Sequence, residues 1–189
     1  MENKENQMIK SEEMVVNIDN DRTDIMVIFD GKIVALQTCT AGIRECKDSI
    51  ADYMRNQYTM AIDEVAAGRL LEQVGAVIRD LENPPAECEV AGTDLVTGAP
   101  MTVKVGHREM AEALDPAIGE IERRILRILE TTPAGYSYNL YNQGFKITGN
   151  VAGLRGLEQR FSKLTSLKVE WNSVRNRNID DKLYEIMIF

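Results

Sequence analysis

The stretch that decides the fold is MVVNIDNDRTDIMVIFDGKIVAL, residues 14–36. It holds three apolar runs separated by two polar turns: Met14–Val16, Asn17–Asp24, Ile25–Phe29, Asp30-Gly31 and Ile33–Leu36. β-Branched and apolar runs separated by Asp, Asn and Asp-Gly are typical of an antiparallel meander. The sequence therefore predicts three consecutive strands, and the polar side chains gather in the first of the two turns.

The composition is that of an ordinary globular protein with an acidic surface. The chain has 189 residues, of which 44% are hydrophobic and 28% charged, and its net charge is -8. Such a charge argues against a broad nucleic-acid surface and against a polybasic membrane patch. No apolar run approaches the ~20 residues of a membrane span. We therefore expect neither a nucleic-acid partner nor a direct membrane anchor.

The N-terminus and the cysteines indicate the cellular compartment. Residues 1–13 are polar and lack the apolar core of a secretion signal, so we expect a flexible N-terminal arm there. The cysteines Cys39, Cys46 and Cys88 are odd in number and form no CxxC pair, which fits packed thiols in a reducing compartment. We predict a cytoplasmic protein.

Helical periodicity follows the meander. Apolar residues at three- and four-residue steps predict helices over 43–54, over 63–74 with Val65 facing inward, and over 116–129. Phe145–Thr148 is predicted as a strand that leads through Gly149-Asn150 into a helix over 151–164. A short helix or strand is expected over 179–188. Strands and helices in this order indicate an α/β layered domain.

Residues 77–110 have a different character. A Pro84-Pro85 breaker precedes an alternating run over 87–91, a turn over 92–100 and a strand over 101–105. We predict a flexible arm over 1–13, a main lobe over 14–76 and 111–189, and a small inserted β-containing lobe over 77–110.

Four segments resemble the bacterial actin-like MreB/Mbl rod shape-determining family, in the same order and spacing. Residues 14–34 resemble its second phosphate segment, an apolar strand followed by Asp-Ile-Gly-Gly-Gly-Thr-Thr and a second strand. GTDLVTGAPMTVKV, residues 92–105, is similar to its Gly-Arg-Asp-Leu-Val-Thr-Gly-x-Pro hairpin. GFKITGNVAGLRGL, residues 144–157, resembles its adenosine segment, and IADYMRNQY, residues 50–58, fits the helix after the meander.

The resemblance implies an actin-like (ribonuclease H-like) ATPase-fold domain, with a mixed sheet flanked by helices. It corresponds to the second of the family's two domains only. The first domain would carry the first phosphate loop and the residue that positions the attacking water.

The phosphate turn departs from the family pattern. Its three glycine positions are Asp19, Asn20 and Asp21, and the leading Asp is Asn17. A carboxylate ~5 Å from a phosphate costs on the order of 3 kcal/mol at an effective dielectric near 20. A magnesium or calcium ion held by Asp19 and Asp21 is an alternative, although Asn and Asp are also ordinary turn residues.

The adenosine and ribose contacts are altered as well. Gly149 remains after Thr148, but the next two glycine positions are Asn150 and Val151. Glu64 matches a ribose-contacting position of the family, whereas the nearby lysine is Leu71. We therefore expect only a degenerate remnant of a nucleotide site, composed of Asn17, Asp19, Asn20, Asp21, Glu64, Thr148, Gly149 and Asn150.

The function expected from these features is non-enzymatic, with no catalytic residue, metal or cofactor. His107 is the only histidine, and no nucleophile-elbow motif GxSxG is present. We expect an MreB-like cell-shape interaction protein that caps or modulates a full-length MreB-type filament, because the family polymerises head to tail, or that self-associates. The alternative is a module that binds ATP and magnesium once a partner chain completes the cleft; Thr148-Gly149 and Glu64 support it.

Overall fold

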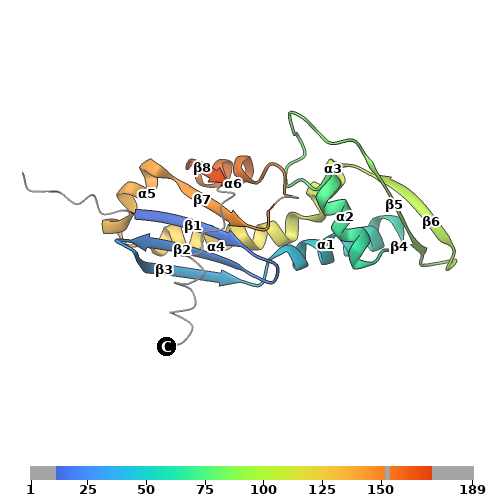
Figure 1. The fold of residues 1–189 in the computed structure, drawn as a ribbon, viewed down its shortest axis with the longest axis horizontal. Helices are drawn as coiled ribbons and strands as arrows, with labels where there is room; N and C mark the ends of the chain where they lie inside the picture. Colours follow the sequence, from blue (N-terminus) through green and yellow to red (C-terminus); the bar gives the residue numbers. More distant parts are fainter. Residues whose placement is uncertain (1–11, 152–153, 172–189) are drawn as a thin grey trace, which may run out of the picture.

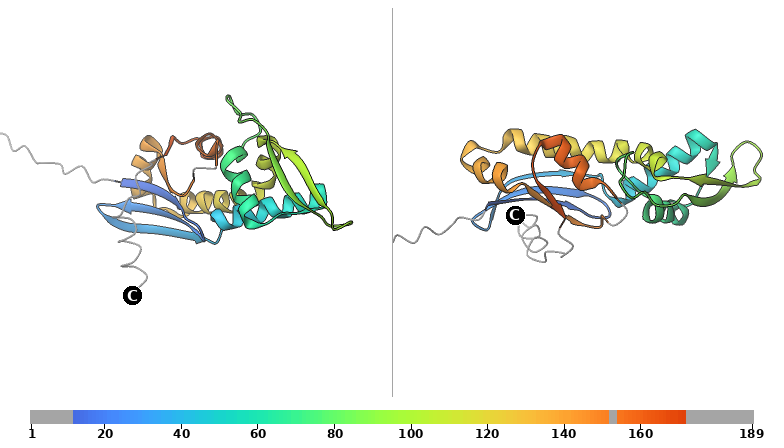
Figure 2. Two further views of the ribbon diagram at one scale, coloured as in Figure 1. Left: turned by 45° about the vertical axis from the view of Figure 1, so that its right-hand side comes forward. Right: turned by 90° about the horizontal axis from the view of Figure 1, so that it is seen from above.

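The computed structural model describes residues 12–151 and 154–171, which form two sheets and their helices (Figure 1). The five-stranded sheet has the order β3-β2-β1-β7-β8, with bounds Glu12–Ile18 for β1, Thr23–Phe29 for β2, Lys32–Cys39 for β3, Phe145–Gly149 for β7 and Val169–Trp171 for β8. The three-stranded sheet has the order β4-β5-β6, with bounds Met60–Ala61, Cys88–Asp94 and Pro100–Val105. Figures 1 and 2 show the two sheets at opposite ends of an elongated molecule.

The helices connect and cover these sheets. Their bounds are Ile43–Tyr58 for α1, Glu64–Val74 for α2, His107–Ala113 for α3, Asp115–Thr131 for α4, Ser137–Gln143 for α5 and Leu157–Thr165 for α6, with a 3₁₀ turn over Ala134–Tyr136. Helix α1 leads from the five-stranded sheet to the three-stranded sheet, and α4 leads back (Figure 1).

The meander predicted over residues 14–36 is confirmed. β1 pairs antiparallel with β2, and β2 pairs antiparallel with β3, with a register shift between Val27 and Ile28. β7 then pairs parallel with the other edge of β1, from Met14 opposite Phe145 to Ile18 opposite Gly149. The sheet is therefore mixed, as the resemblance implied.

The main core lies between one face of this sheet and α4. Met14, Val16, Ile18, Ile25 and Val27 pack in one cluster with the isoleucine stripe of α4, all fully buried: Ile118, Ile121, Ile125 and Ile128. The stripe recurs at the helical period, so one face of α4 supplies the whole contact. Alternate strand residues form a second, smaller cluster on the other face: Val15, Met26, Ile28, Ile33 and Leu36.

The second sheet is a hairpin extended by a two-residue strand. β5 pairs with β6 over Cys88–Thr93 and Pro100–Val105, and Met60 and Ala61 of β4 pair with Asp94 and Thr93. The turn predicted over 92–100 is shorter, because β5 continues to Asp94, whose carboxylate accepts the N–H groups of Val96 and Thr97 at 2.7 and 3.0 Å. Since β4 lies outside 77–110, the boundaries of the inserted lobe stay a prediction.

Two helix predictions are wrong in part. Val65 is 80% exposed rather than inward, because the buried face of α2 is formed by Ala67, Leu70, Leu71 and Val74, and Val65 is out of phase with it. Helix α6 begins at Leu157, not at Val151, because Gly156 before it has φ +84° in the left-handed region and interrupts the helical backbone. The element predicted over 179–188 and residues 1–11 of the arm lie outside the described residues.

The three cysteines are buried free thiols, as predicted. Burial raises the pKa of the Cys46 thiol to about 12. Within the described ranges, no helix has the length and apolar character needed to cross a bilayer.

Candidate functional site

The polar turn of the meander meets the end of β7 and the start of α1. Because β1 and β7 are parallel, their carboxyl ends lie at the same edge of the sheet, with Asn17 opposite Thr148 and Ile18 opposite Gly149. In open α/β sheets this edge is where ligands bind. Seven of the eight predicted site residues come together here: Asn17, Asp19, Asn20, Asp21, Thr148, Gly149 and Asn150.

Two glycines allow the backbone segments to approach closely. Gly149 has φ +95°, and a Cβ atom at this position would lie 2.1 Å from the carbonyl oxygen of Ile18. A Cβ at Gly42, just before α1, would lie 2.6 Å from the Asp19 carbonyl oxygen and 2.7 Å from that of Asn20. The turn is therefore pressed against both β7 and the N-terminus of α1.

The turn also satisfies the first backbone N–H groups of α1. The N–H of Ile43 donates to the Asp19 carbonyl oxygen at 3.0 Å, and the N–H of Arg44 donates to that of Asn20 at 2.9 Å. Free N–H groups at a helix N-terminus attract anions. Here two of them are already bonded to the protein's own carbonyl groups.

The side chains of the turn bond to one another and to the β7 end. The Asn150 amide donates to Asp19 Oδ1 at 3.2 Å and to Asn20 Oδ1 at 3.1 Å. The N–H of Asn20 also donates to Asp19 Oδ1, at 2.8 Å. Asp21 forms an ion pair with Arg44 at 2.8 Å. Asn150 thus bridges the two segments that the resemblance assigns to phosphate and adenosine.

Two buried polar side chains, Asp24 and Thr148, lie next to the turn, and Asp24 was not among the predicted site residues. The buried carboxylate of Asp24 pairs with Arg22 Nε at 2.9 Å and accepts the Thr38 hydroxyl at 2.8 Å. The Thr148 hydroxyl, also buried, donates to Asn17 Oδ1 at 3.0 Å. The sequence does contain a signal for this pair: Arg22 stands two residues before Asp24, at the start of an apolar strand. A buried carboxylate needs a partner of this kind.

Glu64, the eighth predicted residue, pairs with helix α1. Its exposed carboxylate, on the first turn of α2, pairs with Lys47 Nζ of α1 at 3.1 Å. Leu71, at the position of the family's lysine, is buried in the core.

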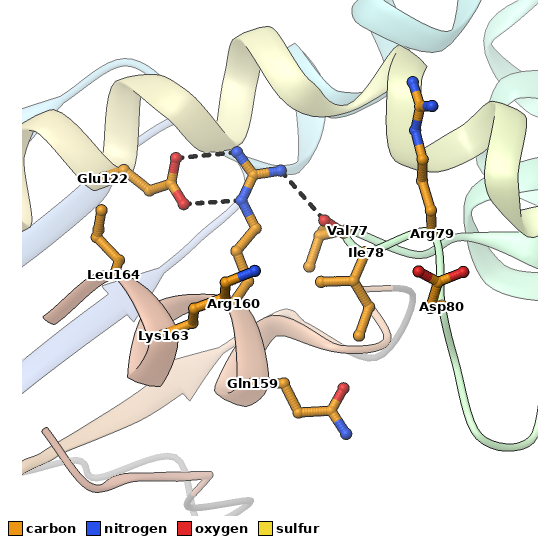
Figure 3. A pocket seen from close by; sticks show the side chains of 9 residues that line it. All are labelled: Val77, Ile78, Arg79, Asp80, Glu122, Gln159, Arg160, Lys163 and Leu164. Carbon is orange, nitrogen blue, oxygen red and sulfur yellow. Dashed lines mark hydrogen bonds and ion pairs between the residues drawn. The ribbon is translucent and has the colours of Figure 1, made fainter. Parts of the chain in front are cut away.

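A second polar cluster, centred on Arg160 of α6, borders a hollow of about 740 Å³ (Figure 3). Arg160 Nε and Nη2 bond to the two carboxylate oxygens of Glu122 at 2.7 and 2.9 Å, and Nη1 donates to the Val77 carbonyl oxygen at 3.1 Å. Arg160 Nη2 also pairs with Asp115 at 2.9 Å. The hydrogen bonds to Glu122 raise the pKa of Arg160, so the guanidinium stays charged.

Arg155 bonds to the same segment around Val77, and we call the contacts of Arg155 and Arg160 with this segment the Arg160 junction. Its Nη1 and Nη2 donate to the carbonyl oxygens of Gly75 and Glu72 at the end of α2, both at 3.0 Å. Its own carbonyl oxygen accepts the N–H of Val77 at 2.9 Å. The segment that leaves α2 is thereby bonded to the β7–α6 connection, which joins the two ends of the molecule. This junction could not be predicted from the sequence, because its partners are far apart along the chain.

Comparison with known proteins identifies the family. Residues 6–177 match the sequence model of the MreB/Mbl protein family. The chain belongs to the MreB/Mbl family.

Two relatives show how much of an MreB/Mbl protein the chain covers. It is 33% identical over 146 residues to the cell shape-determining protein Mbl of Bacillus subtilis (strain 168). The matched region covers 77% of this chain and 43% of Mbl. It is 28% identical over 156 residues to the cell shape-determining protein MreB of Escherichia coli (strain K12). Here the matched region covers 82% of this chain and 44% of MreB. The chain thus spans less than half the length of these relatives.

Solved structures confirm the actin-like fold predicted for this MreB/Mbl chain. MreB5 of Spiroplasma citri bound to AMPPNP superposes with a TM-score of 0.85 at 23% identity, over 95% of this chain and 54% of MreB5. The MamK double helical filament gives a TM-score of 0.67 at 13% identity, over 94% of this chain and 54% of MamK. At these identities the likeness concerns the fold.

Proposed function

We propose that this MreB-like chain is an interaction protein of the cell-shape cytoskeleton that does not hydrolyse ATP. In it, the turn corresponding to the family's phosphate segment serves as a structural turn. The observation that carries this proposal is the Asn150 amide, which bonds to both Asp19 Oδ1 and Asn20 Oδ1. The protein's own side chains thereby satisfy the turn.

The residues present do not fit a nucleotide phosphate. A phosphate turn offers backbone N–H groups without side chains in the way, whereas the N–H groups of Asn20, Ile43 and Arg44 donate to protein oxygens. Asp19 and Asp21 add two carboxylates, each costing on the order of 3 kcal/mol at ~5 Å from a phosphate. The ion pair of Asp21 with Arg44 offsets little of this, because exposed pairs contribute only ~0–1 kcal/mol.

The metal alternative receives no support from the geometry. A magnesium or calcium ion between Asp19 and Asp21 needs carboxylates free to turn toward it, but each is bonded to protein donors. Within residues 12–151 and 154–171, no group of three or more His, Cys, Asp or Glu side chains could hold a metal ion. The proposal therefore places no metal ion at this turn.

For the partner we propose a full-length MreB-type filament, which the chain caps or modulates. The family relationship and the fold shared with the MamK double helical filament support an actin-like polymer as the partner. A head-to-tail polymer grows only if each subunit presents two different surfaces. A bound subunit that presents one of them stops growth at that end.

Isothermal titration with ATP and magnesium tests the nucleotide part of this proposal. We expect no binding at submillimolar concentrations, with a full-length MreB-type protein as the positive control. A matched variant replaces the turn residues by the family glycines (Asp19→Gly, Asn20→Gly and Asp21→Gly) and asks whether binding returns. Submillimolar affinity of the unchanged chain would contradict the proposal.

Sedimentation with a full-length MreB-type filament tests the partner. We expect the chain to lower the pelleted filament mass, or to shorten the filaments seen by electron microscopy, at substoichiometric amounts. Filaments of unchanged mass and length at equimolar chain would rule out capping and modulation.

The alternative function is an ATP-binding module that a partner chain completes. Its support is the pair Thr148-Gly149 at the end of β7 and the exposed carboxylate of Glu64 on α2. A completing partner would have to displace the Asn150 bridge. Repeating the titration in the presence of the filament, with the filament alone as the reference, separates the two functions, since only the module adds ATP sites to those of the filament.

A further inference from the structure

The five-stranded sheet has a second apolar face, opposite the face that packs on α4. Val15 and Met26 of this second face are fully buried, and Ile28 is 7% exposed. Side chains of a strand stand roughly perpendicular to the sheet, so neighbours in the same sheet shield their flanks and leave their tips open. The full burial of Val15 and Met26 therefore requires a layer of atoms over this face.

No helix of the described chain contributes a side chain to the cluster on the second face. The apolar side chains that pack there against Val15, Met26 and Ile28 are Ile33 and Leu36, both from β3 of the same sheet. The core side chains of α4, α5 and α6 belong to the cluster on the first face, and Figure 2 shows α4 and α6 on one side of the sheet. The burial holds for one chain with no partner beside it. The covering residues are therefore sought in three stretches of the same chain: 1–11, 152–153 and 172–189.

The composition of these stretches distinguishes them. Residues 152–153 are Ala-Gly, which is too short to cover a sheet. Residues 1–11, MENKENQMIKS, hold three apolar side chains among eight polar ones. Residues 179–189, IDDKLYEIMIF, hold seven apolar side chains: Ile179, Leu183, Tyr184, Ile186, Met187, Ile188 and Phe189.

The apolar positions of residues 179–189 also have a suitable spacing. Positions 179, 183, 186 and 187 recur at helical steps, so the sequence predicts one apolar stripe there. The charged residues fall between the members of the stripe: Asp180, Asp181, Lys182 and Glu185. Such an amphipathic pattern is typical of an element that packs on a core by one face and meets water with the other.

β8 brings the chain close to the second face. Trp171 lies opposite Ile147 of β7, which lies opposite Val16 of β1, the neighbour of Val15. β8 is three strands away from β2 in the sheet order, which corresponds to about 14 Å at ~4.8 Å per strand. The largely polar residues 172–178, NSVRNRN, can span about 23 Å when extended. This reach is sufficient to place the apolar run after them over β1 and β2.

We propose that residues 179–189 pack on the second face of the five-stranded sheet. The stripe at 179, 183, 186 and 187 contacts the apolar side chains of that face: Val15, Met26, Ile28, Ile33 and Leu36. While the segment is in place, this face is closed to other partners, so a filament or a second copy has to bind elsewhere. The proposal is independent of the proposed nucleotide and filament functions.

Disulfide trapping within one chain tests the contact. Leu36→Cys, on the second face, is combined with Leu183→Cys or with Ile186→Cys and oxidised at low protein concentration. We expect an intrachain disulfide from both pairs, identified by non-reducing electrophoresis and peptide mass spectrometry. Ala35→Cys, next to Leu36 on β3 but packed on the first face, is the matched control and should give at least tenfold less. The native cysteines are buried and do not compete.

The other possible covers give different products in the same experiment. An intrachain disulfide between Leu36→Cys and Ile9→Cys, with none to position 183 or 186, would mean that residues 1–11 cover the face. A disulfide between two chains that carry Leu36→Cys alone would mean that a second copy covers it. Either product overturns the proposal, and so do equal yields from Leu36→Cys and Ala35→Cys.

A second measurement uncovers the face. Leu183→Asp combined with Ile186→Asp should raise the fluorescence of the dye ANS several-fold, because ANS binds exposed apolar surface. Asp181→Asn combined with Lys182→Gln changes two charged positions of the same segment and should leave the fluorescence unchanged. Circular dichroism shows whether each variant is folded, and an unchanged signal from a folded Leu183→Asp, Ile186→Asp variant overturns the proposal. If that variant does not fold, the disulfide yields decide by themselves.

Discussion

The β1–β2 turn and the Arg160 junction both join distant segments through ion pairs and hydrogen bonds, but their exposure differs. The Asp21 and Arg44 side chains are 65% and 70% exposed, whereas those of Glu122 and Arg160 are 18% and 16% exposed. An exposed pair contributes ~0–1 kcal/mol, while breaking a mostly buried pair leaves an uncompensated charge. The side chains of the turn can therefore change at little cost to the fold, and those of the junction cannot.

The backbone of the turn tolerates change less well than its side chains do. The close approach of Gly149 to Ile18, and of Gly42 to Asp19, is built into the pairing of β1 with β7 and the start of α1. The backbone of the turn is therefore fixed by its neighbours, whereas its exposed side chains are not.

Gly149→Ala should lower the unfolding free energy most, because it places a side chain where the backbone of the turn packs closely against β7. The new Cβ would lie 2.1 Å from the Ile18 carbonyl oxygen at φ +95°, and strain with steric overlap should lower the unfolding free energy by about 3–5 kcal/mol. Gly98→Ala is the control: its φ is +73° with open space around it, so we expect about 1–2 kcal/mol. Urea unfolding measures both, and equal losses would contradict the steric account.

Arg160→Ala should lower the unfolding free energy by about 2–4 kcal/mol, because it leaves the Glu122 carboxylate without its bidentate partner. The control is Arg127→Ala at an exposed position of the neighbouring helix α4, where a change within about 0.5 kcal/mol is expected. Replacing both partners, Arg160→Met with Glu122→Leu, should recover part of the loss. If Arg160→Ala cost no more than Arg127→Ala, the contrast between turn and junction would be wrong.

Tyr53→Phe should lower the stability of the fold by an amount that depends on pH. Burial and the hydrogen bond to Glu112, which also pairs with Arg79, raise the pKa of Tyr53 to about 12. A phenol whose pKa is higher in the folded state than its ordinary value near 10 stabilises the fold below pH ~10, and this contribution disappears as the pH rises toward 12.

The expected loss for Tyr53→Phe at neutral pH is about 1 kcal/mol, and the difference from the parent chain should narrow between pH 10 and 12. Denaturant titrations at a series of pH values measure it. Tyr141→Phe, at an exposed tyrosine, is the control. A difference that stays constant up to pH 12 would contradict the assigned role of the phenol.

Asn150→Ala should have the smallest effect. Its two hydrogen bonds, at 3.2 and 3.1 Å, are exposed to water, so the unfolding free energy should fall by no more than about 0.5–1 kcal/mol. Thermal or urea unfolding measures the change, with Asp21→Ala as a second exposed position. A loss above about 2 kcal/mol would mean that the turn is as important to the fold as the junction.

Local patterns were sufficient for the meander and for helix α4. Alternating apolar runs separated by Asp-Gly predicted β1 to β3, and the isoleucine stripe behind Pro116 predicted α4, because both depend on periods that short segments carry by themselves. The start of α6 was not predictable in this way. A Cβ at Gly156 would lie 2.5 Å from Ile78, so the left-handed backbone there suits the close approach of a segment far earlier in the chain.

For the candidate site, the sequence by itself determined which residue types stand in the turn and at the end of β7. Only the tertiary structure decided what those residues do. Asn150 reaches Asp19 across 131 positions of the chain because β1 and β7 pair in parallel, while Glu64 pairs with Lys47. Side-chain partners follow from non-local strand pairing and helix packing, and no local period encodes them.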